Sequence, residues 1–363
     1  MGSRAATCFV FVLLTALVVA FETASSATRV RVSLLGTPQT LTAGQAWTAR
    51  LAVRPASFDG ALRLVAKGPG TVRVRATGRR GSYRARLRFP RAGRWTLTAL
   101  AGRSTSRLGS VRVSAAPFTF VYPTSIDLEP GGTLLLVENG RRRLLRVNLG
   151  TGRTDVLASS LSRPFGVAHS SPGSIYFSDE TVKRIDGAGP PVEVAPSDEQ
   201  VGPVTVAPNG DVYYATTTRV FLLVGGTGTP VRIAGTGVQG SGGDGGPATS
   251  AQVWAPHGLA LAADGALLVS DTGNDRIRRI DLATGLIGSI AEVGIPDGIE
   301  VASDGTIYVA EARTNRVVHL SASGARLGLV GPRFSTPFDV AVGADAVYVL
   351  ETGTSGRVRR IAR

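Results

Sequence analysis

The sequence predicts an all-β chain in which a basic β-sandwich precedes a six-bladed β-propeller. Three observations favour this fold class. Near the N-terminus, residues 71–75 and 83–88 alternate strictly between apolar residues and arginine or another polar residue, as strands with one solvated face do. The charge balance then changes abruptly near residue 115. From that point a pattern of about 40 residues recurs to the end of the chain, which indicates a repeat architecture.

The first 27 residues are expected to be a signal peptide. Arg4 precedes an apolar run from Phe9 to Phe21, which has the length of a signal-peptide core and is too short to span a bilayer as a helix. Ser25 and Ala27 suit the cleavage site, so cleavage is expected near Ala27. The segment 1–27 therefore predicts a secreted protein, extracellular or at the cell surface. An uncleaved anchor and a buried helix are the alternatives.

Cysteine usage agrees with this expectation. Cys8 is the only cysteine and lies inside the apolar segment. The mature chain is therefore expected to contain no disulfide, no thiolate metal site and no cysteine nucleophile.

Charge divides the mature chain at residue 115. Residues 28–115 contain 18 Lys or Arg and a single acid, Asp59, whereas residues 116–363 contain 21 Lys or Arg and 24 acids. Such a step predicts two domains, 28–115 and 116–363, with different surfaces.

The basic domain is expected to hold about seven short strands, separated by turns rich in glycine and proline. Its stretch from Phe89 through Trp95 to Leu97 resembles the late strands of bacterial immunoglobulin-like domains. The resemblance implies an immunoglobulin-like β-sandwich for residues 28–115.

The arginines of this domain suggest an anionic polymer, phosphate groups or the acidic propeller as a partner. The alternative is a solvated surface. Of the 40 basic residues only Lys67 and Lys183 are lysine, a bias typical of a GC-rich genome that uses arginine for any exposed cation. Nucleic acid is not expected, because the chain has an export signal and no aromatic stacking surface.

Each repeat of the second domain opens at a proline slot, passes a glycine turn and ends its second strand on an acid. The opening slots are 123, 164, 201, 256, 296 and 337, of which 201 is a valine. The third repeat is degenerate, and an insertion, 235–252, separates it from the fourth. A repeat of this kind predicts one four-stranded blade, and closing the blades into a ring covers the faces of their sheets.

The fourth repeat, with Pro256-His-Gly-Leu and Asp271-Thr-Gly-Asn-Asp-Arg-Ile, resembles the NHL repeat family, and the fifth repeat is similar. This resemblance implies a six-bladed NHL-like propeller over residues 116–363. The last repeat shows only three strands. Phe118–Tyr122 is therefore expected to supply the fourth strand and close the ring.

The residue after each opening slot is expected to lie at the mouth of the central channel. The six positions are Thr124, Phe165, Gly202, His257, Asp297 and Phe338. The candidate binding residues are Phe165, His257, Asp297 and Phe338, because a His–Asp pair can act as a base or hold a ligand and the phenylalanines add an apolar wall. The alternative is a solvated polar rim without chemistry. No residue is assigned a catalytic role.

Five acids end the second strands: Glu138, Asp179, Asp271, Glu311 and Glu351. Their recurrence favours a structural role, in which each carboxylate accepts backbone N–H bonds, over a catalytic one. The glycines of the insertion 235–252 predict a mobile loop on the mouth face beside His257.

Taken together, these patterns predict an exported binding or scaffold protein that uses the propeller face for an extracellular protein or a cell-surface carbohydrate. Some NHL-like propellers are enzymes, and that resemblance implies the alternative, a lactonase-like hydrolase or an amidating-lyase-like enzyme with a metal in its channel. His169, His257 and His319 occupy slots that keep them apart, and the loop at Asp244 has one acid. We therefore expect no metal, no other cofactor, no transmembrane span and a monomer.

Overall fold

The computed structural model describes residues 30–36, 41–42, 46–54, 56–58, 60–89, 93–102, 104–114, 119–150, 153–170, 173–197 and 199–363. The chain forms two compact units, one ending at Ala116 and one that starts at Pro117 and holds the rest except residues 150–152. The signal peptide predicted for residues 1–27 lies outside the described residues. In the part of the chain that is described, no helix has the length and apolar character needed to cross a membrane.

The first unit consists of two sheets. One has the order β1 (Arg31–Leu35), β3 (Ala46–Arg54), β7 (Ser82–Arg88) and β6 (Thr77–Arg79). The other has the order β2 (Leu41–Thr42), β9 (Ser104–Ser114), β8 (Gly93–Ala101), β4 (Leu62–Lys67) and β5 (Thr71–Arg75). All neighbouring strands are antiparallel apart from β2 and β9.

Side chains from both sheets meet in one apolar cluster. In β7 the alternation predicted from the sequence is present, since Tyr83, Ala85 and Leu87 are buried while the arginines between them are exposed. Trp95 is fully buried, and its ring centroid lies 5.2 Å from that of Phe89. The all-β prediction for this unit is thus confirmed, whereas the immunoglobulin-like assignment stays a prediction.

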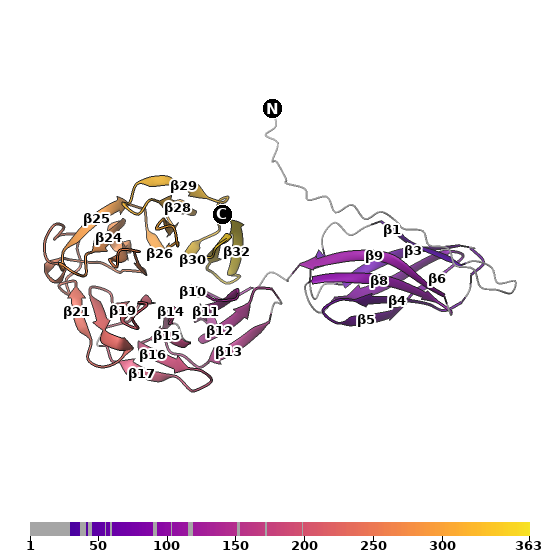
Figure 1. Cartoon of the computed structure of the whole chain (residues 1–363), viewed down its shortest axis with the longest axis horizontal. Helices are drawn as coiled ribbons and strands as arrows, with labels where there is room; N and C mark the ends of the chain where they lie inside the picture. The colour runs from indigo at the N-terminus through magenta and orange to yellow at the C-terminus, as the bar shows by residue number, and fades with distance from the viewer. Residues whose placement is uncertain are drawn as a thin grey trace, which may run out of the picture. The chain divides into compact units, whose positions relative to one another are not determined.

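The second unit contains six antiparallel sheets arranged as blades around a centre (Figure 1). From the inner strand outward, the first three blades are β10 (Pro123–Glu129), β11 (Thr133–Glu138), β12 (Arg143–Asn148), β13 (Thr154–Ala158); β14 (Pro164–His169), β15 (Ser174–Asp179), β16 (Thr181–Asp186), β17 (Val192–Ala195); and β18 (Val204–Val206), β19 (Val212–Ala215), β20 (Val220–Leu223), β21 (Val231–Ala234). The last three are β22 (Gly258–Leu261), β23 (Leu267–Asp271), β24 (Arg276–Ile280), β25 (Ile287–Glu292); β26 (Pro296–Val301), β27 (Ile307–Glu311), β28 (Arg316–Leu320), β29 (Arg326–Val330); and β30 (Pro337–Val342), β31 (Ala346–Glu351), β32 (Arg357–Ala362).

Short 3-10 turns punctuate the loops. They are η1 (Asn139–Arg141), η2 (Val224–Gly226), η3 (Ala248–Ser250) and η4 (Thr272–Asn274).

The inner strands form a closed ring. Each contacts the inner strand of the next blade, and β30 contacts β10. An apolar cluster lies at every junction between neighbouring blades of the described chain, such as the one that joins Leu135 of the first blade to Val167 and Phe177 of the second. A blade buries its two faces only against its neighbours, so the ring forms as a unit. The repeat boundaries predicted from the sequence match the blades.

Ring closure differs from the sequence prediction. Phe118–Tyr122 was expected to form a full fourth strand, but Phe118 lies outside the described residues and the neighbouring chain makes one antiparallel bridge, between Phe120 and Gly356. Both backbone hydrogen bonds of this bridge are present, at 2.7 and 2.8 Å, and Tyr122 N donates to Gly353 O. The buried Phe120 side chain packs with Ile126 of the first blade and with apolar residues of the last. The segment therefore clamps the two ends of the ring instead of extending the last sheet.

Loss of this clamp is expected to open the last blade. We predict that Phe120→Ala lowers the free energy of unfolding of the propeller by about 3–5 kcal/mol, because a buried aromatic side chain is removed. Amide hydrogen exchange in β32 should rise more than exchange in β25. Val156→Ala, at an exposed position of β13, is the control and should change stability by less than about 0.5 kcal/mol. Equal exchange in β32 of both variants would contradict the clamp.

Candidate functional site

A histidine–aspartate pair occupies the channel mouth. His257 directly precedes β22 and Asp297 is the second residue of β26, so the adjacent inner strands bring them together. A hydrogen bond of 2.7 Å joins His257 Nδ1 to Asp297 Oδ1. Burial raises the pKa of Asp297, and the hydrogen bond to His257 opposes that shift. Because Nδ1 is held by the carboxylate, Nε2 is the ring nitrogen that can meet another molecule.

The two members of this pair differ in solvent exposure. The side chain of Asp297 is 5% exposed and that of His257 is 32% exposed. A buried carboxylate behind an accessible imidazole is the arrangement that fixes the tautomer and the orientation of a general base.

Two aromatic side chains flank the histidine. The ring centroid of His257 lies 5.3 Å from that of Phe165 and 5.8 Å from that of Phe338. The two phenylalanine rings meet edge to face, with centroids 5.8 Å apart. The structure thus brings together all four candidate residues, Phe165, His257, Asp297 and Phe338. Their role in binding stays a prediction.

A cavity of about 230 Å³ lies in the channel below this mouth. All six inner strands contribute to its wall. Besides Phe165 and His257, the lining includes the titratable side chains of Asp127, His169, Glu300 and Asp339.

Three of these lining residues are carboxylic acids on the wall of the channel. Burial raises the pKa of Glu300 to about 8, and the charges of Asp127 and Asp339 add to the shift. Burial also raises the pKa of Asp339 to about 7, although the backbone N–H groups of Ile126 and Val340 each donate to its carboxylate at 2.8 Å. At neutral pH the carboxyl group of Glu300 is therefore mostly protonated.

Asp127, Glu300 and Asp339 were not among the site residues predicted from the sequence, although their positions in the repeats carry a signal. Asp127 and Glu300 both stand four residues after the opening proline, each next to an aliphatic residue of the same inner strand. Asp339 occupies the slot that is glycine in the second, fourth and fifth repeats. One of those glycines, Gly298, faces Asp339 so closely that a Cβ there would lie 1.9 Å from Asp339 Oδ1.

The other two histidines, His169 and His319, do not lie at the mouth. His169 is the last residue of β14, at the end of the inner strand opposite Phe165, and its Nδ1 lies 2.6 Å from Asp127 Oδ2. Hydrogen bonding to Asp127 raises the pKa of His169. The backbone N of His169 also donates to the same oxygen, at 2.7 Å, so this pair ties the first blade to the second. His319 stacks on Tyr308 with ring centroids 4.4 Å apart.

The channel does not fit a resident metal ion. Among the described residues, no three side chains of His, Cys, Asp or Glu are grouped so that they could hold one. Both oxygens of Asp339 accept backbone N–H groups, and Asp127 is bound twice by His169. A catalytic zinc needs about three protein ligands. The described residues that line the channel therefore do not provide a zinc site.

The five recurring acids have the structural role that the sequence predicted. Each carboxylate is buried and accepts a backbone N–H from the segment that leads into its own blade. The pairs are Glu138 with Val121, Asp179 with Ser162, Asp271 with Trp254, Glu311 with Gly294 and Glu351 with Ser335. In the degenerate third blade, Glu199 lies on the entering segment itself and contacts Thr218 and Arg219.

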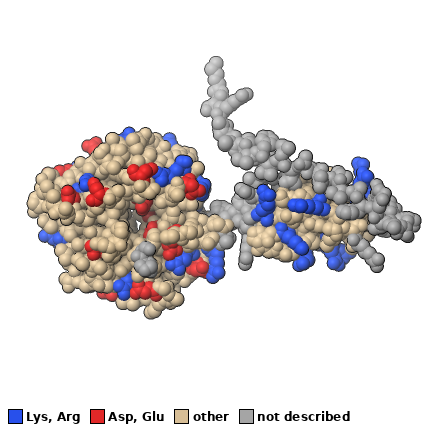
Figure 2. Space-filling view, viewed as in Figure 1, with Lys and Arg blue, Asp and Glu red and all other residues tan. Residues whose placement is uncertain are grey.

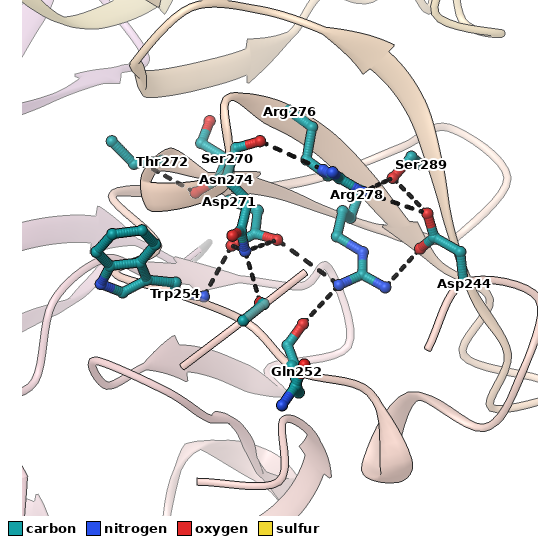
Figure 3. Close-up of polar contacts among 11 residues, drawn as sticks. Asp244, Gln252, Trp254, Ser270, Asp271, Thr272, Asn274, Arg276, Arg278 and Ser289 are labelled. Carbon is teal, nitrogen blue, oxygen red and sulfur yellow. Dashed lines mark hydrogen bonds and ion pairs between the residues drawn. The ribbon is translucent and has the colours of Figure 1, made fainter. Parts of the chain in front are cut away.

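A buried arginine fixes the insertion to the fourth blade (Figure 3). Arg278 of β24 is fully buried, and it donates to Asp244 Oδ1 at 2.5 Å and to Gln252 O at 2.6 Å. It also lies 3.6 Å from Asp271 Oδ2. Ser289 donates to the other oxygen of Asp244. One guanidinium thus joins two segments of the insertion region to the acid that holds Trp254.

Residues 243–252 of the insertion, for which the sequence predicted a mobile loop, are tied to the fourth blade by backbone hydrogen bonds. Gly245 N donates to Ile287 O, Ile287 N donates to Gly246 O and Ala248 N donates to Gly285 O, so the loop runs along the outer edge of the fourth blade. The glycine-rich composition serves tight turns there. Residues Gly237–Gln239 line a separate open groove with Thr217 and Thr218.

The turn after β23 holds the backbone that leads to both members of the mouth pair. Asp271 Oδ1 accepts Trp254 N at 2.8 Å, three residues before His257. The hydroxyl of Thr272 donates to Pro296 O, directly before Asp297. Asp271 and Thr272 therefore position His257 and Asp297 relative to one another.

Comparisons with known proteins address the fold only. Neither a comparison with protein-family models nor one with curated protein sequences gave a match for this chain. Among solved structures, the chain is similar to a gluconolactonase from Xanthomonas campestris, with 16% identity and a TM-score of 0.56 over 68% of this chain and 88% of that one. Regucalcin, a calcium-binding protein from Agrobacterium tumefaciens, matches with 16% identity and a TM-score of 0.51 over 68% and 93%.

A third similar structure is a protein of unknown function from Bacteroides thetaiotaomicron. It has 12% identity and a TM-score of 0.56, over 92% of this chain and 98% of that one. At such identities the likeness shows that the second unit has the propeller fold of these proteins. The NHL-repeat assignment stays a prediction.

The buried arginine yields a matched pair of variants. We predict that Arg278→Met costs about 3–5 kcal/mol of stability, because it leaves the buried Asp271 without its cation. Arg279→Met removes the neighbouring arginine, whose partner Asp264 is 63% exposed, and should cost at most about 1 kcal/mol. Chemical denaturation of both variants measures the difference. Similar losses of stability in the two variants would contradict a special role for the buried Arg278.

The raised pKa of Glu300 predicts how stability depends on pH. Between pH 4.5 and about 8 the folded protein keeps a proton that the unfolded chain releases. Stability from this group is complete below that range and is lost as pH rises through it. Glu300→Gln should flatten the fall in melting temperature between pH 5 and 9, relative to wild type and to the exposed control Glu292→Gln. An unchanged pH profile would refute the enclosed, protonated state of Glu300.

Proposed function

We propose that the propeller is a hydrolase or lyase whose active site is the channel mouth, with lactone hydrolysis as its most direct activity. The observation that carries this proposal is the 2.7 Å hydrogen bond between an accessible His257 and the buried Asp297 at the entrance to a polar cavity. A histidine oriented in this way can remove a proton from water or from a carbon acid at neutral pH. The similar folds named above are compatible with this class and carry no more than that.

In this proposal, His257 Nε2 takes a proton from a water molecule as its oxygen attacks the lactone carbonyl. A C–O bond forms between water and the carbonyl carbon, and the ring C–O bond breaks when the tetrahedral intermediate collapses. Asp297 holds the imidazolium in place while it carries the proton. Phe165 and Phe338 supply apolar walls for the carbon skeleton of the substrate.

Glu300 is the proposed acid. A carboxyl group with a pKa of about 8 is protonated at neutral pH and can give its proton to the departing ring oxygen. Its proton is held by enclosure and by the facing carboxyls of Asp127 and Asp339. In this proposal His257 is the base and Glu300 is the acid, the two roles that general acid–base catalysis requires.

A binding role is the second candidate. The three mutually contacting rings of Phe165, His257 and Phe338 form an aromatic cluster at the mouth. Such a cluster suits the apolar face of a sugar or a protein side chain. An exported protein that binds an extracellular protein or a cell-surface glycan without turning it over would use these same residues. Export, the immunoglobulin-like sandwich and the NHL assignment belong to both candidates as predictions.

Histidine replacement at the two ends of the channel tests the enzymatic proposal. We predict that His257→Gln lowers kcat for hydrolysis of γ- and δ-lactones by about 10²–10⁴-fold with the fold unchanged. His169→Gln is the matched control, since it also removes a histidine paired with an aspartate, and it should retain most of the turnover. Product formation is followed by mass spectrometry. Equal losses in both variants, or no lactone turnover by wild type, would refute the proposal, and ligand binding without turnover would favour the second candidate.

Glu300, the proposed acid, predicts a specific dependence of activity on pH. Wild-type activity should fall as pH rises through about 8, when Glu300 ionises. Glu300→Gln should lower kcat by about 10²-fold across the pH range, because an amide cannot give up a proton. A variant with full activity would remove Glu300 from the mechanism without affecting the assignment of His257.

A further inference from the structure

One face of the first unit carries arginines that its own residues cannot neutralise. In the sheet β1-β3-β7-β6, the side chains of Arg50, Arg84, Arg86 and Arg88 are all exposed. Asp59 is the only acid between residues 28 and 115. Ion pairs within this unit therefore leave most of the positive charge unbalanced.

Strand register places some of these charges directly against one another. Arg50 of β3 is paired with Arg84 of β7, and Arg31 of β1 is paired with Arg54 of β3. Residues opposite each other in an antiparallel pair share a face, with Cβ atoms about 4.5–5.5 Å apart, and like charges there are destabilising. The sheet thus holds a repulsive arrangement that does not serve the fold itself.

A preference for arginine in the genome accounts for the residue type and not for this arrangement. The propeller also uses arginine in place of lysine, with Lys183 as the one exception in its sequence. There, however, 24 acids balance the 21 basic residues after residue 115. Its arginines pair with carboxylates, for example Arg146 with Glu129, Arg279 with Asp264 and Arg360 with Asp345. Figure 2 shows basic side chains mixed with acidic ones on the propeller, and basic side chains alone on the displayed, described face of the first unit.

The grid of charges fits an extended chain of anions. Alternate residues of one strand stand about 6.6–6.8 Å apart, and neighbouring strands about 4.8 Å apart. Arg84, Arg86 and Arg88 therefore form a straight row, with Arg50 beside it. Arginine binds phosphate through two parallel N–H bonds, and binding several phosphates releases the counterions that both partners hold. A linear polymer with a phosphate at each repeat would meet the whole row.

We propose that the outer face of the β1-β3-β7-β6 sheet binds a linear phosphate-bearing polymer along the row Arg84, Arg86 and Arg88. The polymer supplies the negative charge that the sequence of this unit lacks and relieves the repulsion between paired arginines. This site is independent of the channel mouth.

Binding of the full chain to long-chain inorganic polyphosphate tests the proposal. The triple variant Arg84→Gln, Arg86→Gln, Arg88→Gln should bind at least about tenfold more weakly at 0.1 M salt, and its plot of log affinity against log salt should be less steep by about two to three. The control, Arg153→Gln with Arg326→Gln and Arg360→Gln, removes the same charge from the propeller and should keep the wild-type slope. Equal slopes for both triple variants, or no binding by wild type, would overturn the proposal.

Two further measurements distinguish polyphosphate binding from a structural role of the arginines and from nucleic-acid binding. Arg84→Thr should raise the melting temperature of the first unit by about 1–4 °C while it weakens polyphosphate binding, because it removes the repulsion with Arg50. A purely structural role for Arg84 predicts a lower melting temperature. Oligothymidylate with the same number of phosphates should bind more weakly than polyphosphate. If it binds as tightly or more tightly, the face is a nucleic-acid surface and the proposal fails.

Discussion

The geometry of the propeller depends on one repeated hydrogen bond, between a buried carboxylate at the end of each second strand and a backbone N–H of the segment that enters the blade. Glu138, Asp179, Asp271, Glu311 and Glu351 all make it. A buried carboxylate needs such partners, since its charge is otherwise costly in a low-dielectric interior. The bond fixes where the inner strand begins and therefore where the mouth residues stand. In the third blade the acid, Glu199, lies on the entering segment instead, and it accepts hydrogen bonds from Thr218 and Arg219, which follow the second strand.

The mouth pair is a product of this backbone arrangement. Asp271 holds the chain ahead of His257 and Thr272 holds the chain ahead of Asp297, so neighbouring residues of one turn position both side chains. Backbone strain marks the same rim: Ile295 and Thr336 have φ values of 51° and 81° directly before the prolines that open their strands. Branched side chains are unfavourable in this region and persist where the surroundings over-determine them. The rim is thus held more tightly than a solvated loop requires.

The sequence predicted the parts of this structure that repeat. The proline slots located the six inner strands, and the slot order alone brought His257 beside Asp297 because adjacent blades place equivalent residues together. Features that occur once were harder to predict. Glycine content suggested a mobile insertion, but the loop is held by Arg278, whose position in the middle of β24 carries no local signal for a buried ion pair. Asp127, Glu300 and Asp339 were missed because only the closed ring shows that residues from three blades face one cavity.

The two histidine–aspartate pairs in one channel show how context separates chemistry from structure. Both have short contacts, 2.6 Å for His169 with Asp127 and 2.7 Å for His257 with Asp297. Asp127 Oδ2 also accepts the backbone N of His169, so that carboxylate anchors an inner strand of the neighbouring blade. Among the described residues, the side chain of Asp297 makes its hydrogen bond to the imidazole of His257, and that imidazole lines the cavity and is 32% exposed. Asp127 also anchors backbone, so it cannot release the imidazole of His169 to a substrate without weakening the contact between two blades. Asp297 can instead orient a histidine that gains and loses a proton.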